Sequence, residues 1–556
     1  MLASLLTFLL VVFVTLFIAF PLLVLILLKL VPGPLLSWAD ERAYRALDVE
    51  RYNRESPYNA PGFKPQHTLC TQQALQPSRP LPADLNGVYL RNGTNLQFAQ
   101  TRGRYHMFNG AGMLHQISIS NGKAFYSNQY VKTPRYQIEQ AAGADQYLHF
   151  GDLAGGGKAG LARMVITAMK QRFGVLPKLE VLESGNSTTA IQYHHGKLYC
   201  LQETGYPFAL DTRLEDGELR LSGEGQFDTF DGKLDSPFTA HPKIDPSTGD
   251  WYTFSTEFQQ GKLRHSRVHE GRLVAHSVID QQKPALAFLH DYFLTENYLV
   301  FPDLSLRFDP KALFGPEQSP MVFDADYPMR WGVIRRDHQD GDAVRWFTTG
   351  QPGHLWHVVN GWEEKRADGG TDIVLFAPVF RSYPSTIPIH NPQEPHTTFN
   401  KWRLNIDDGR VTEDRILLDH FYERPSFNTA FLGRPNRYAY LLDEQKEGMM
   451  AKGVLKYDMI DEREVAYFDY GAFYGGEALF VPRATNSGSD SHNDSNASPA
   501  EDDGYLLELL MGADRAELLI LDAATMSEVS RLPIPQRVPF GVHSCWLNPM
   551  QVQALA

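Results

Sequence analysis

Four histidines stand in local settings that set them apart from the other histidines of the chain. They lie in Thr-Ala-His241-Pro-Lys, Phe-Leu-His290-Asp-Tyr, Trp-His357-Val-Val-Asn-Gly-Trp-Glu-Glu and Pro-Phe-Gly-Val-His543. Neutral imidazoles bind borderline metal ions such as iron, copper, nickel or zinc. Because these four are spread over about 300 residues, they can meet only in a fold that brings distant segments to one axis. If they meet, the protein is a metalloenzyme.

Other residues near these motifs compete for a role in the chemistry. The chain has 19 histidines, and His354, three residues before His357, is the nearest rival ligand. His357 is preferred because it closely precedes the Asn-Gly-Trp-Glu-Glu run. Glu363 and Glu364 are adjacent on a predicted strand and therefore face opposite ways, which excludes them as an acid and base pair on one substrate.

The composition narrows the class of protein. A net charge of −13 leaves no basic surface to neutralise phosphates, which excludes a nucleic-acid partner. Three scattered cysteines cannot form a disulfide framework and make no Cys/His finger, so we expect a reducing compartment and no structural zinc. Hydrophobic residues at 43% and aromatic residues at 12% supply a large core, and the aromatic, Gly and Pro content favours β structure.

The N-terminus predicts a membrane anchor over residues 1–30. Residues 1–28 carry no charged side chain, and Lys29 is the first. A helix of that length spans about 42 Å, more than the roughly 30 Å of a bilayer core. No small-residue cleavage site follows, so we expect an uncleaved single-pass helix. Lys29, Arg42 and Arg45 after the span place the catalytic part in the cytosol.

The remainder divides into a Pro-rich connector over residues 31–82 and a β-rich catalytic domain over 83–556. The prolines of the connector are expected to exclude long regular elements. Beyond it, short alternating runs separated by turn signals predict many strands and few helices, which is typical of a sandwich series or a propeller. The strands expected from these runs include 87–91, 114–119, 124–128, 251–255, 298–301, 372–376, 438–442 and 517–521. A seven-bladed β-propeller with short helices capping one face suits the length and brings distant histidines to one axis.

Two segments depart from the β pattern. Residues 161–175 predict a helix that either contacts a membrane, with Lys158, Arg163, Lys170 and Arg172 reaching outwards, or packs over one propeller face. Residues 484–501 are rich in Ser, Asn, Asp and Gly and predict a disordered surface loop.

The motifs together resemble the carotenoid cleavage oxygenase family, which includes plant and algal carotenoid cleavage dioxygenases, bacterial apocarotenoid and lignostilbene oxygenases and an animal retinoid isomerase. The resemblance runs from about Pro82 to the C-terminus, and plant-type dioxygenases are the most similar in appearance. It is carried by residues 86–95, 107–113 and 477–483, by 501–504, and by the settings of all four histidines.

The resemblance implies a seven-bladed propeller with Fe(II) on its axis. Its ligands would be His241, His290, His357 and His543. Three carboxylates, those of Glu203, Glu423 and Glu477, would each accept a hydrogen bond from a ligand imidazole. Such carboxylates fix the tautomer of each ring and offset the charge of the ion. No residue beyond this metal site is predicted to be catalytic, and no organic cofactor is expected.

The chain departs from the family pattern at several positions. Asn109 and Ala111 replace two acidic residues of a glycine-rich block, Thr94 stands where proline is common, and Gly361 replaces an alanine. None is a predicted ligand. The loss of two carboxylates near a turn is expected to alter the packing of a loop or the passage of the substrate. The identity of the substrate is therefore the prediction that these departures affect.

We therefore predict a membrane-anchored Fe(II)-dependent dioxygenase that cleaves a conjugated C=C bond of a carotenoid or apocarotenoid with O2 to give two carbonyl products. Its partners would be an apolar polyene, O2 and a membrane, with no obligate protein partner. One alternative is a stilbene-cleaving dioxygenase, whose phenolic substrate needs a polar anchor such as Lys132, Arg135 or Tyr136. The other is a non-catalytic propeller that serves as a binding module.

Overall fold

A computed structural model describes residues 20–555 of the protein, except 57, 59–60, 100, 154, 258–259, 282–286, 316–318, 384–395, 445–449 and 485–499. Most of the loop predicted over 484–501 and residues 1–19 of the predicted anchor lie outside the described residues. The rest of the anchor forms α2 (Phe20–Leu30). Among the residues described, no helix has both the length and the apolar character needed to cross a membrane. The described chain thus gives no support for a transmembrane helix over residues 1–30.

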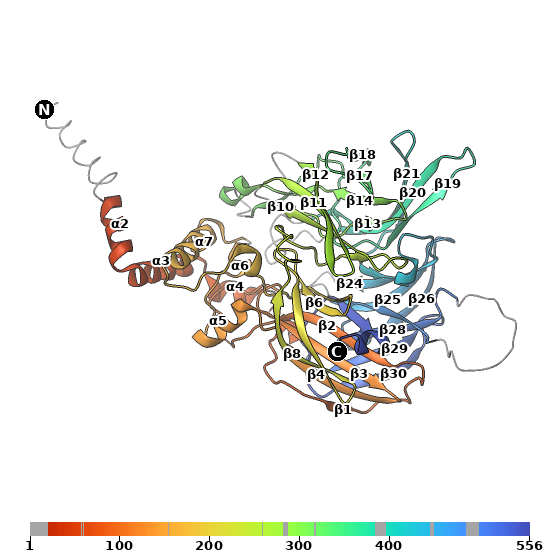
Figure 1. Ribbon diagram of the computed structural model, residues 1–556, viewed down its shortest axis with the longest axis horizontal. Helices are drawn as coiled ribbons and strands as arrows, with labels where there is room; N and C mark the ends of the chain where they lie inside the picture. Colours follow the sequence, from red (N-terminus) through yellow and green to blue (C-terminus); the bar gives the residue numbers. More distant parts are fainter. Residues whose placement is uncertain are drawn as a thin grey trace.

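Over its described residues the chain forms seven antiparallel sheets of four or five strands, the blades of a β-propeller (Figure 1). This confirms the predicted all-β propeller. The strands of each blade are given in order from one edge to the other. The first blade is β31 (Ser544–Leu547), β2 (Gly87–Asn95), β3 (Ala111–Ser120), β4 (Lys123–Tyr130) and β1 (Gln73–Leu75), and the second is β5 (Ala190–His194), β6 (Lys197–Leu201), β7 (Phe208–Glu215) and β8 (Glu218–Phe227). The third is β9 (Lys243–Ile244), β10 (Trp251–Glu257), β11 (Lys262–His269) and β12 (Arg272–Gln281), and the fourth is β13 (Phe293–Leu294), β14 (Tyr298–Asp303), β17 (Arg330–Arg335) and β18 (Arg345–Thr348).

The last three blades follow the same order. They are β19 (Asn360–Lys365), β20 (Thr371–Ser382), β21 (His396–Asn405) and β22 (Arg410–Leu418); β23 (Tyr422–Ser426), β24 (Tyr438–Glu444), β25 (Ala451–Asp458) and β26 (Arg463–Asp469); and β27 (Leu479–Pro482), β28 (Gly504–Met511), β29 (Ala516–Asp522) and β30 (Glu528–Ile534). A separate pair, β15 (Leu306–Phe308) and β16 (Met321–Phe323), extends from the fourth blade.

The ring is closed by the two ends of the propeller domain. The C-terminal strand β31 pairs antiparallel with β2 near the start of the domain, with Val88 opposite Leu547 and Arg91 opposite Ser544. This joint needs two glycines where β2 passes the chain that leads to His543. A Cβ atom on Gly93 would lie 2.8 Å from Cα of Gly541, which is too close for any side chain.

The core lies between the blades, where the side chains of neighbouring sheets meet. In β4 every second residue is buried, so one face of this strand packs inwards. β28 is buried along its whole length, so both of its faces are covered by other side chains. Trp251, Trp331 and Trp402 are fully buried. Large aromatic side chains of this kind fill the wedge between twisted sheets and hold the ring rigid.

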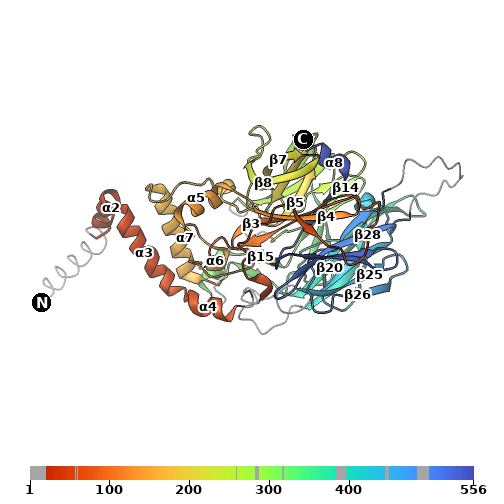
Figure 2. The same ribbon diagram turned by 90° about the horizontal axis from the view of Figure 1, so that it is seen from below.

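Helices gather on the N-terminal side of the propeller (Figures 1 and 2). They are α3 (Pro32–Ala46), α4 (Val49–Glu55), α5 (Pro134–Ala142), α6 (Phe150–Leu153) and α7 (Gly157–Arg172), while α8 (Pro549–Gln553) follows β31. Single 3₁₀ turns are η3 (Pro61–Phe63), η4 (Val181–Glu183), η5 (Pro310–Phe314) and η6 (Thr429–Phe431).

The expectation that the connector excludes long regular elements is wrong at α3. Its prolines Pro32 and Pro34 lie in the first turn of the helix, where the missing N–H groups would have no partner in any case. The strand β1 of the first blade also lies within residues 31–82.

Asp40 of α3 joins this helix to α7. Its carboxylate accepts hydrogen bonds from Nε of Arg163 at 3.1 Å and from Nζ of Lys170 at 2.6 Å. Arg163 also donates to Asp152 and is buried. Of the two alternatives for this helix, the one in which Arg163 and Lys170 reach outwards to a membrane is wrong for these two residues, because both are held by carboxylates between the helices.

Candidate metal centre

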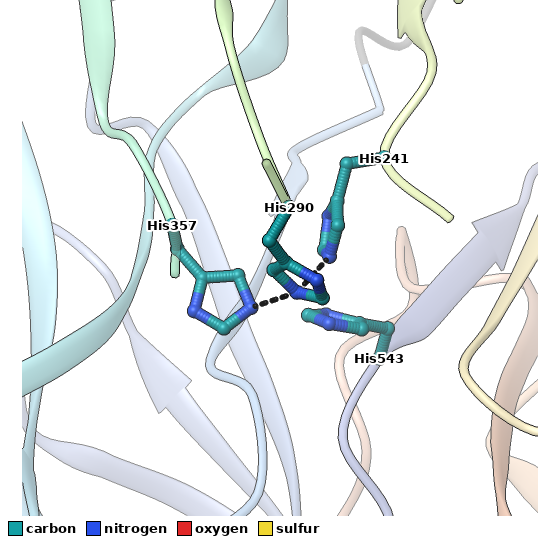
Figure 3. A group of neighbouring side chains, drawn as sticks. All are labelled: His241, His290, His357 and His543. Carbon is teal, nitrogen blue, oxygen red and sulfur yellow. Dashed lines mark hydrogen bonds between the residues drawn. The ribbon is translucent and has the colours of Figure 1, made fainter. Parts of the chain in front are cut away.

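The four predicted histidines are brought together by equivalent places in four blades. His241, His290, His357 and His543 each lie one to three residues before the edge strand that opens a blade, namely β9, β13, β19 and β31. These edges face the propeller axis, so segments far apart in sequence present their imidazoles to one point (Figure 3). One nitrogen from each ring lies within 4.8 Å of one nitrogen from every other ring.

The imidazoles meet through their Nε2 atoms. Nε2 of His290 lies 2.9 Å from Nε2 of His241 and 3.3 Å from Nε2 of His357. The ring of His543 stands edge-on to that of His241, with centroids 4.4 Å apart. His290, His357 and His543 are buried, and His241 is partly buried.

Three carboxylates stand behind three of the rings. Nδ1 of His290 lies 2.7 Å from Oε1 of Glu203, Nδ1 of His357 lies 2.5 Å from Oε2 of Glu423, and Nδ1 of His543 lies 3.3 Å from Oε1 of Glu477. The structure thus places all seven predicted site residues in one cluster. Among the described residues, His241 makes no ion pair with a carboxylate.

Burial controls the protonation of the site. It lowers the pKa of His241 and His357 well below the ordinary value, and the neighbouring imidazoles add to the effect, so both rings are neutral. Burial raises the pKa of Glu423 to about 7, although the backbone N–H and the positive charge of Arg424 both act to lower it. Burial also opposes ionisation of Glu203, but its partner His290 outweighs this, and the pKa of Glu203 lies below its ordinary value.

The donor set fits a metal ion. A neutral imidazole donates from one nitrogen and accepts at the other. Because the Nδ1 atoms of His290 and His357 face carboxylates, their Nε2 atoms carry lone pairs, and these lie only 3.3 Å apart. Two lone pairs at that distance repel each other unless a cation lies against both. Nitrogen donors without a ligand carboxylate suit iron, copper, nickel or zinc.

Asp291 connects three of the ligand segments, and no prediction from the sequence included it. It follows His290, one of its oxygens lies 2.6 Å from Nζ of Lys243, and the other accepts the backbone N–H of Val358 at 3.1 Å. Lys243 and Val358 come directly after the segments of His241 and His357. The only signal in the sequence was that charged residues stand beside two of the histidine motifs.

The rival residues lie elsewhere. His354 is fully buried but does not join the cluster; its ring packs against Trp356 and Tyr383. Glu363 accepts hydrogen bonds from Thr295 and Asn297, and Glu364 accepts one from Trp362. The two carboxylates therefore have separate structural partners.

The proposed anchors for a phenolic substrate already have partners. Lys132 donates to Glu224 at 2.9 Å and Arg135 to Glu139 at 3.3 Å, both at the start of α5. Tyr136 is buried, with its ring 5.3 Å from that of Tyr130.

Two departures from the family pattern have physical reasons in the structure. The Asn109 amide donates to the carbonyl oxygen of Arg104 at 2.6 Å, which an aspartate could not do. A Cβ atom on Gly361 would lie 2.6 Å from the side chain of Leu375, so this position has no room for alanine unless Leu375 shifts. Ala111 is buried in β3 opposite Asn95, and Thr94 lies in β2 opposite Gly112.

Comparison with known proteins agrees with this fold. Residues 63–548 match the family model described as retinal pigment epithelial membrane protein. A carotenoid 9,10(9',10')-cleavage dioxygenase of Crocus sativus is 32% identical over 505 residues, which cover 85% of each chain. In structure, the chain is similar to a lignostilbene dioxygenase of Pseudomonas brassicacearum, with a TM-score of 0.70, 24% identity and coverage of 88% of this chain and 98% of the other. It is equally similar to a Synechocystis apocarotenoid oxygenase, with a TM-score of 0.70, 22% identity and the same coverage.

The fold and the histidine cluster define a propeller oxygenase. The chain belongs to the family of the retinal pigment epithelial membrane protein and the carotenoid cleavage oxygenases, and the protein is an enzyme of the oxygenase class. The family resemblance seen in the sequence motifs is confirmed.

Proposed function

We propose that the protein is an Fe(II)-dependent dioxygenase that cleaves a conjugated C=C bond of a carotenoid or apocarotenoid with O2. The observation that carries this proposal is the convergence of four imidazoles, three of them backed by carboxylates, on the propeller axis. His241, His290, His357 and His543 would hold the iron. When bound, iron supplies the redox chemistry by which O2 reacts with an alkene.

The carboxylates and the chain around them prepare the site. Glu203, Glu423 and Glu477 would keep the proton of each partner ring on Nδ1, which leaves Nε2 free for the metal, and they offset part of the charge of the ion. The reaction balances without an external reductant, because the C=C bond and the O=O bond break and each carbon receives one oxygen atom. We expect no organic cofactor.

An aromatic wall beside the histidines supports a polyene substrate. The ring of Trp356 stands edge-on to that of His290, with centroids 5.0 Å apart, and it also contacts Phe288 at 5.4 Å. Tyr383 extends this wall, 6.0 Å from Trp356. Flat aromatic surfaces bind an extended conjugated chain by dispersion and exclude water from it.

The helical side of the molecule supports a membrane as the source of the substrate. Apolar side chains are exposed along α2, α3 and α7, which lie together on the N-terminal side (Figure 2). They include Leu30, Trp38, Met164 and Val165, of which Leu30 is 72% exposed and Trp38 59%. Exposed apolar groups on neighbouring helices insert into the interface of a bilayer. If the predicted anchor over residues 1–30 spans a membrane, the charges of Lys29, Arg42 and Arg45 after it place the catalytic domain in the cytosol.

The other two functions have less support. Cleavage of a stilbene would need a free polar anchor, and Lys132 and Arg135 are held by carboxylates. A non-catalytic propeller would have no use for three carboxylates aligned behind three converging imidazoles.

The test is expression in bacteria that accumulate carotenoids, with mass spectrometry of the pigments, beside a His290→Ala control. Loss of pigment with paired carbonyl fragments in the wild-type strain alone supports the proposal. Purified protein supplied with ¹⁸O2 should place one labelled oxygen atom in each fragment. If iron-loaded, folded protein leaves carotenoids and apocarotenoids intact but cleaves a hydroxystilbene, the substrate proposal is wrong.

A further inference from the structure

A fully buried ion pair lies directly behind the carboxylate that supports His357. Nε of Arg424 donates to Oε1 of Glu444 at 2.6 Å, and the side chains of both residues are at most 1% exposed. Arg424 follows Glu423 in β23, and Glu444 ends the neighbouring strand β24. Neither residue belongs to the histidine cluster.

The backbone at Arg424 is unusual. Its φ is +41°, in the left-handed region, and among the described residues it is the one non-glycine with positive φ that lies inside a strand. The pairing of β23 with β24 shifts register between Glu423 and Ser426, so the residue forms part of a bulge. Pro425 follows, and a residue before proline is driven to extended conformations. Nothing in the local sequence therefore favours this conformation.

The left-handed conformation has a direct effect on the metal centre. It turns the backbone N–H of Arg424 onto Oε2 of Glu423, to which it donates a short hydrogen bond. The same oxygen accepts the hydrogen bond from Nδ1 of His357. Glu423 is thus held between the ring that it supports and the backbone of its neighbour. A strained backbone of this kind persists only where its surroundings hold it.

The ion pair is suited to be that support. A buried ion pair adds little to stability compared with apolar side chains of similar volume, so its presence calls for another reason. Here the guanidinium anchors the side chain of the strained residue to the next strand of the blade. The bulge also reaches the neighbouring blade, because the hydroxyl of Ser426 donates to the carbonyl oxygen of Ala478, beside Glu477.

We propose that the Arg424–Glu444 ion pair is a positioning device for the metal centre. It holds residue 424 in the left-handed conformation, which fixes Glu423 on His357, so that metal affinity depends on a pair that touches neither the ion nor a histidine. The inference rests on the proposed metal site but not on the substrate or the reaction.

The test separates the backbone conformation from the ion pair. In Arg424→Leu/Glu444→Leu the pair is replaced by apolar side chains, and leucine has no preference for positive φ. In Arg424→Gly/Glu444→Leu the pair is also removed, but glycine adopts positive φ without strain. Glu423→Gln serves as the reference for loss of the carboxylate. For each protein the measurements are the Kd for Co(II), by competition with a chelator, the visible spectrum of the Co(II) form, and thermal unfolding of the apoprotein.

We expect the Leu/Leu protein to fold and to bind Co(II) about 10- to 100-fold more weakly than wild type, with an altered spectrum, as for other residues that orient a ligand. The Gly/Leu protein should bind at least about tenfold more tightly than the Leu/Leu protein. Equal affinities of these two proteins, or wild-type affinity in the Leu/Leu protein, would overturn the proposal. If the Leu/Leu protein does not fold, Arg424→Met/Glu444→Met gives the same comparison with longer side chains. Failure of wild type itself to bind Co(II) would refute the metal site rather than the positioning.

Discussion

The carboxylate of Asp291 lies 2.6 Å from the ammonium group of Lys243, and this contact joins the segment of His290 to the segment of His241. The side chain of Asp291 is 3% exposed and that of Lys243 is 16% exposed. Lys243→Met should leave a buried carboxylate without its counter-ion and lower the free energy of unfolding by about 3 kcal/mol. Chemical denaturation of the apoprotein measures this. Lys197→Met, which removes an exposed pair with Asp228, should cost less than about 1 kcal/mol. If both substitutions lower the free energy of unfolding by the same amount, the contact between Asp291 and Lys243 has no special structural role.

His357→Ala and His354→Leu should separate the ligand from its rival. The first removes one of the four converging imidazoles, so purified protein should lose most of its iron, as measured by elemental analysis. The second changes a buried ring outside the cluster, and iron content should stay close to one ion per chain. Full iron content in His357→Ala, or its loss in a folded His354→Leu protein, would contradict the assignment.

The stability of the protein should depend on pH through Glu508. Its carboxylate accepts a hydrogen bond from Tyr470, and burial raises its pKa to about 8. The unfolded chain has a glutamate pKa of about 4.3. The folded state therefore holds the proton more tightly, and the stabilising contribution is complete below pH 4.3 and is lost as the pH rises to about 8. Compared with Glu508→Gln, wild type should lose stability over this window with a slope approaching about 1.4 kcal/mol per pH unit. Urea unfolding at a series of pH values checks this. Glu296→Gln, at an exposed position, is the control, and its free energy of unfolding should follow that of wild type at every pH. If wild type instead gains stability relative to Glu508→Gln as the pH rises, the prediction is wrong.

Closure of the ring should make β31 essential for stability. Leu547 is fully buried and lies opposite Val88 of β2. Leu547→Ala should lower the free energy of unfolding by about 2–5 kcal/mol, because the propeller cannot collapse around the lost side chain. Ile460→Ala, at a position that is 54% exposed, is the control and should change little. A mild effect at Leu547 would mean that the two ends of the domain are not coupled.

Charges placed on α7 should weaken binding to lipid vesicles. Met164 and Val165 are exposed on this helix, and Met164→Asp/Val165→Asp puts two carboxylates where the proposed interface needs apolar groups. We expect a several-fold loss in sedimentation with phospholipid vesicles, with cleavage of detergent-solubilised substrate unchanged. The comparison is Val274→Asp, which is also exposed but lies on β12, a strand of the third blade, and not on a helix. If wild type, the double variant and Val274→Asp bind vesicles equally, the helical side is not the surface that docks on the membrane.

The sequence by itself determined the strands and the chemistry of the ligands. Runs such as 87–91 and 517–521 became parts of β2 and β29, because alternation of side chains and turn residues act over a few residues. The histidine motifs could be recognised because each is a local pattern. The helix over 161–175 was also predicted, as most of α7.

Only the tertiary structure decided how these pieces act together. Local pattern could not show that Glu423 meets His357, since the pair is 66 residues apart and joins successive blades. It carried no signal for Glu444, which matters only because it lies at the end of β24, across from the bulge in β23. It also left open which way Arg163 and Lys170 face, whereas the structure pairs both with Asp40 of α3, a helix that is distant in sequence. Secondary structure follows from neighbours in sequence, whereas the partner of a buried charge is fixed by the register of the blades and the closure of the ring.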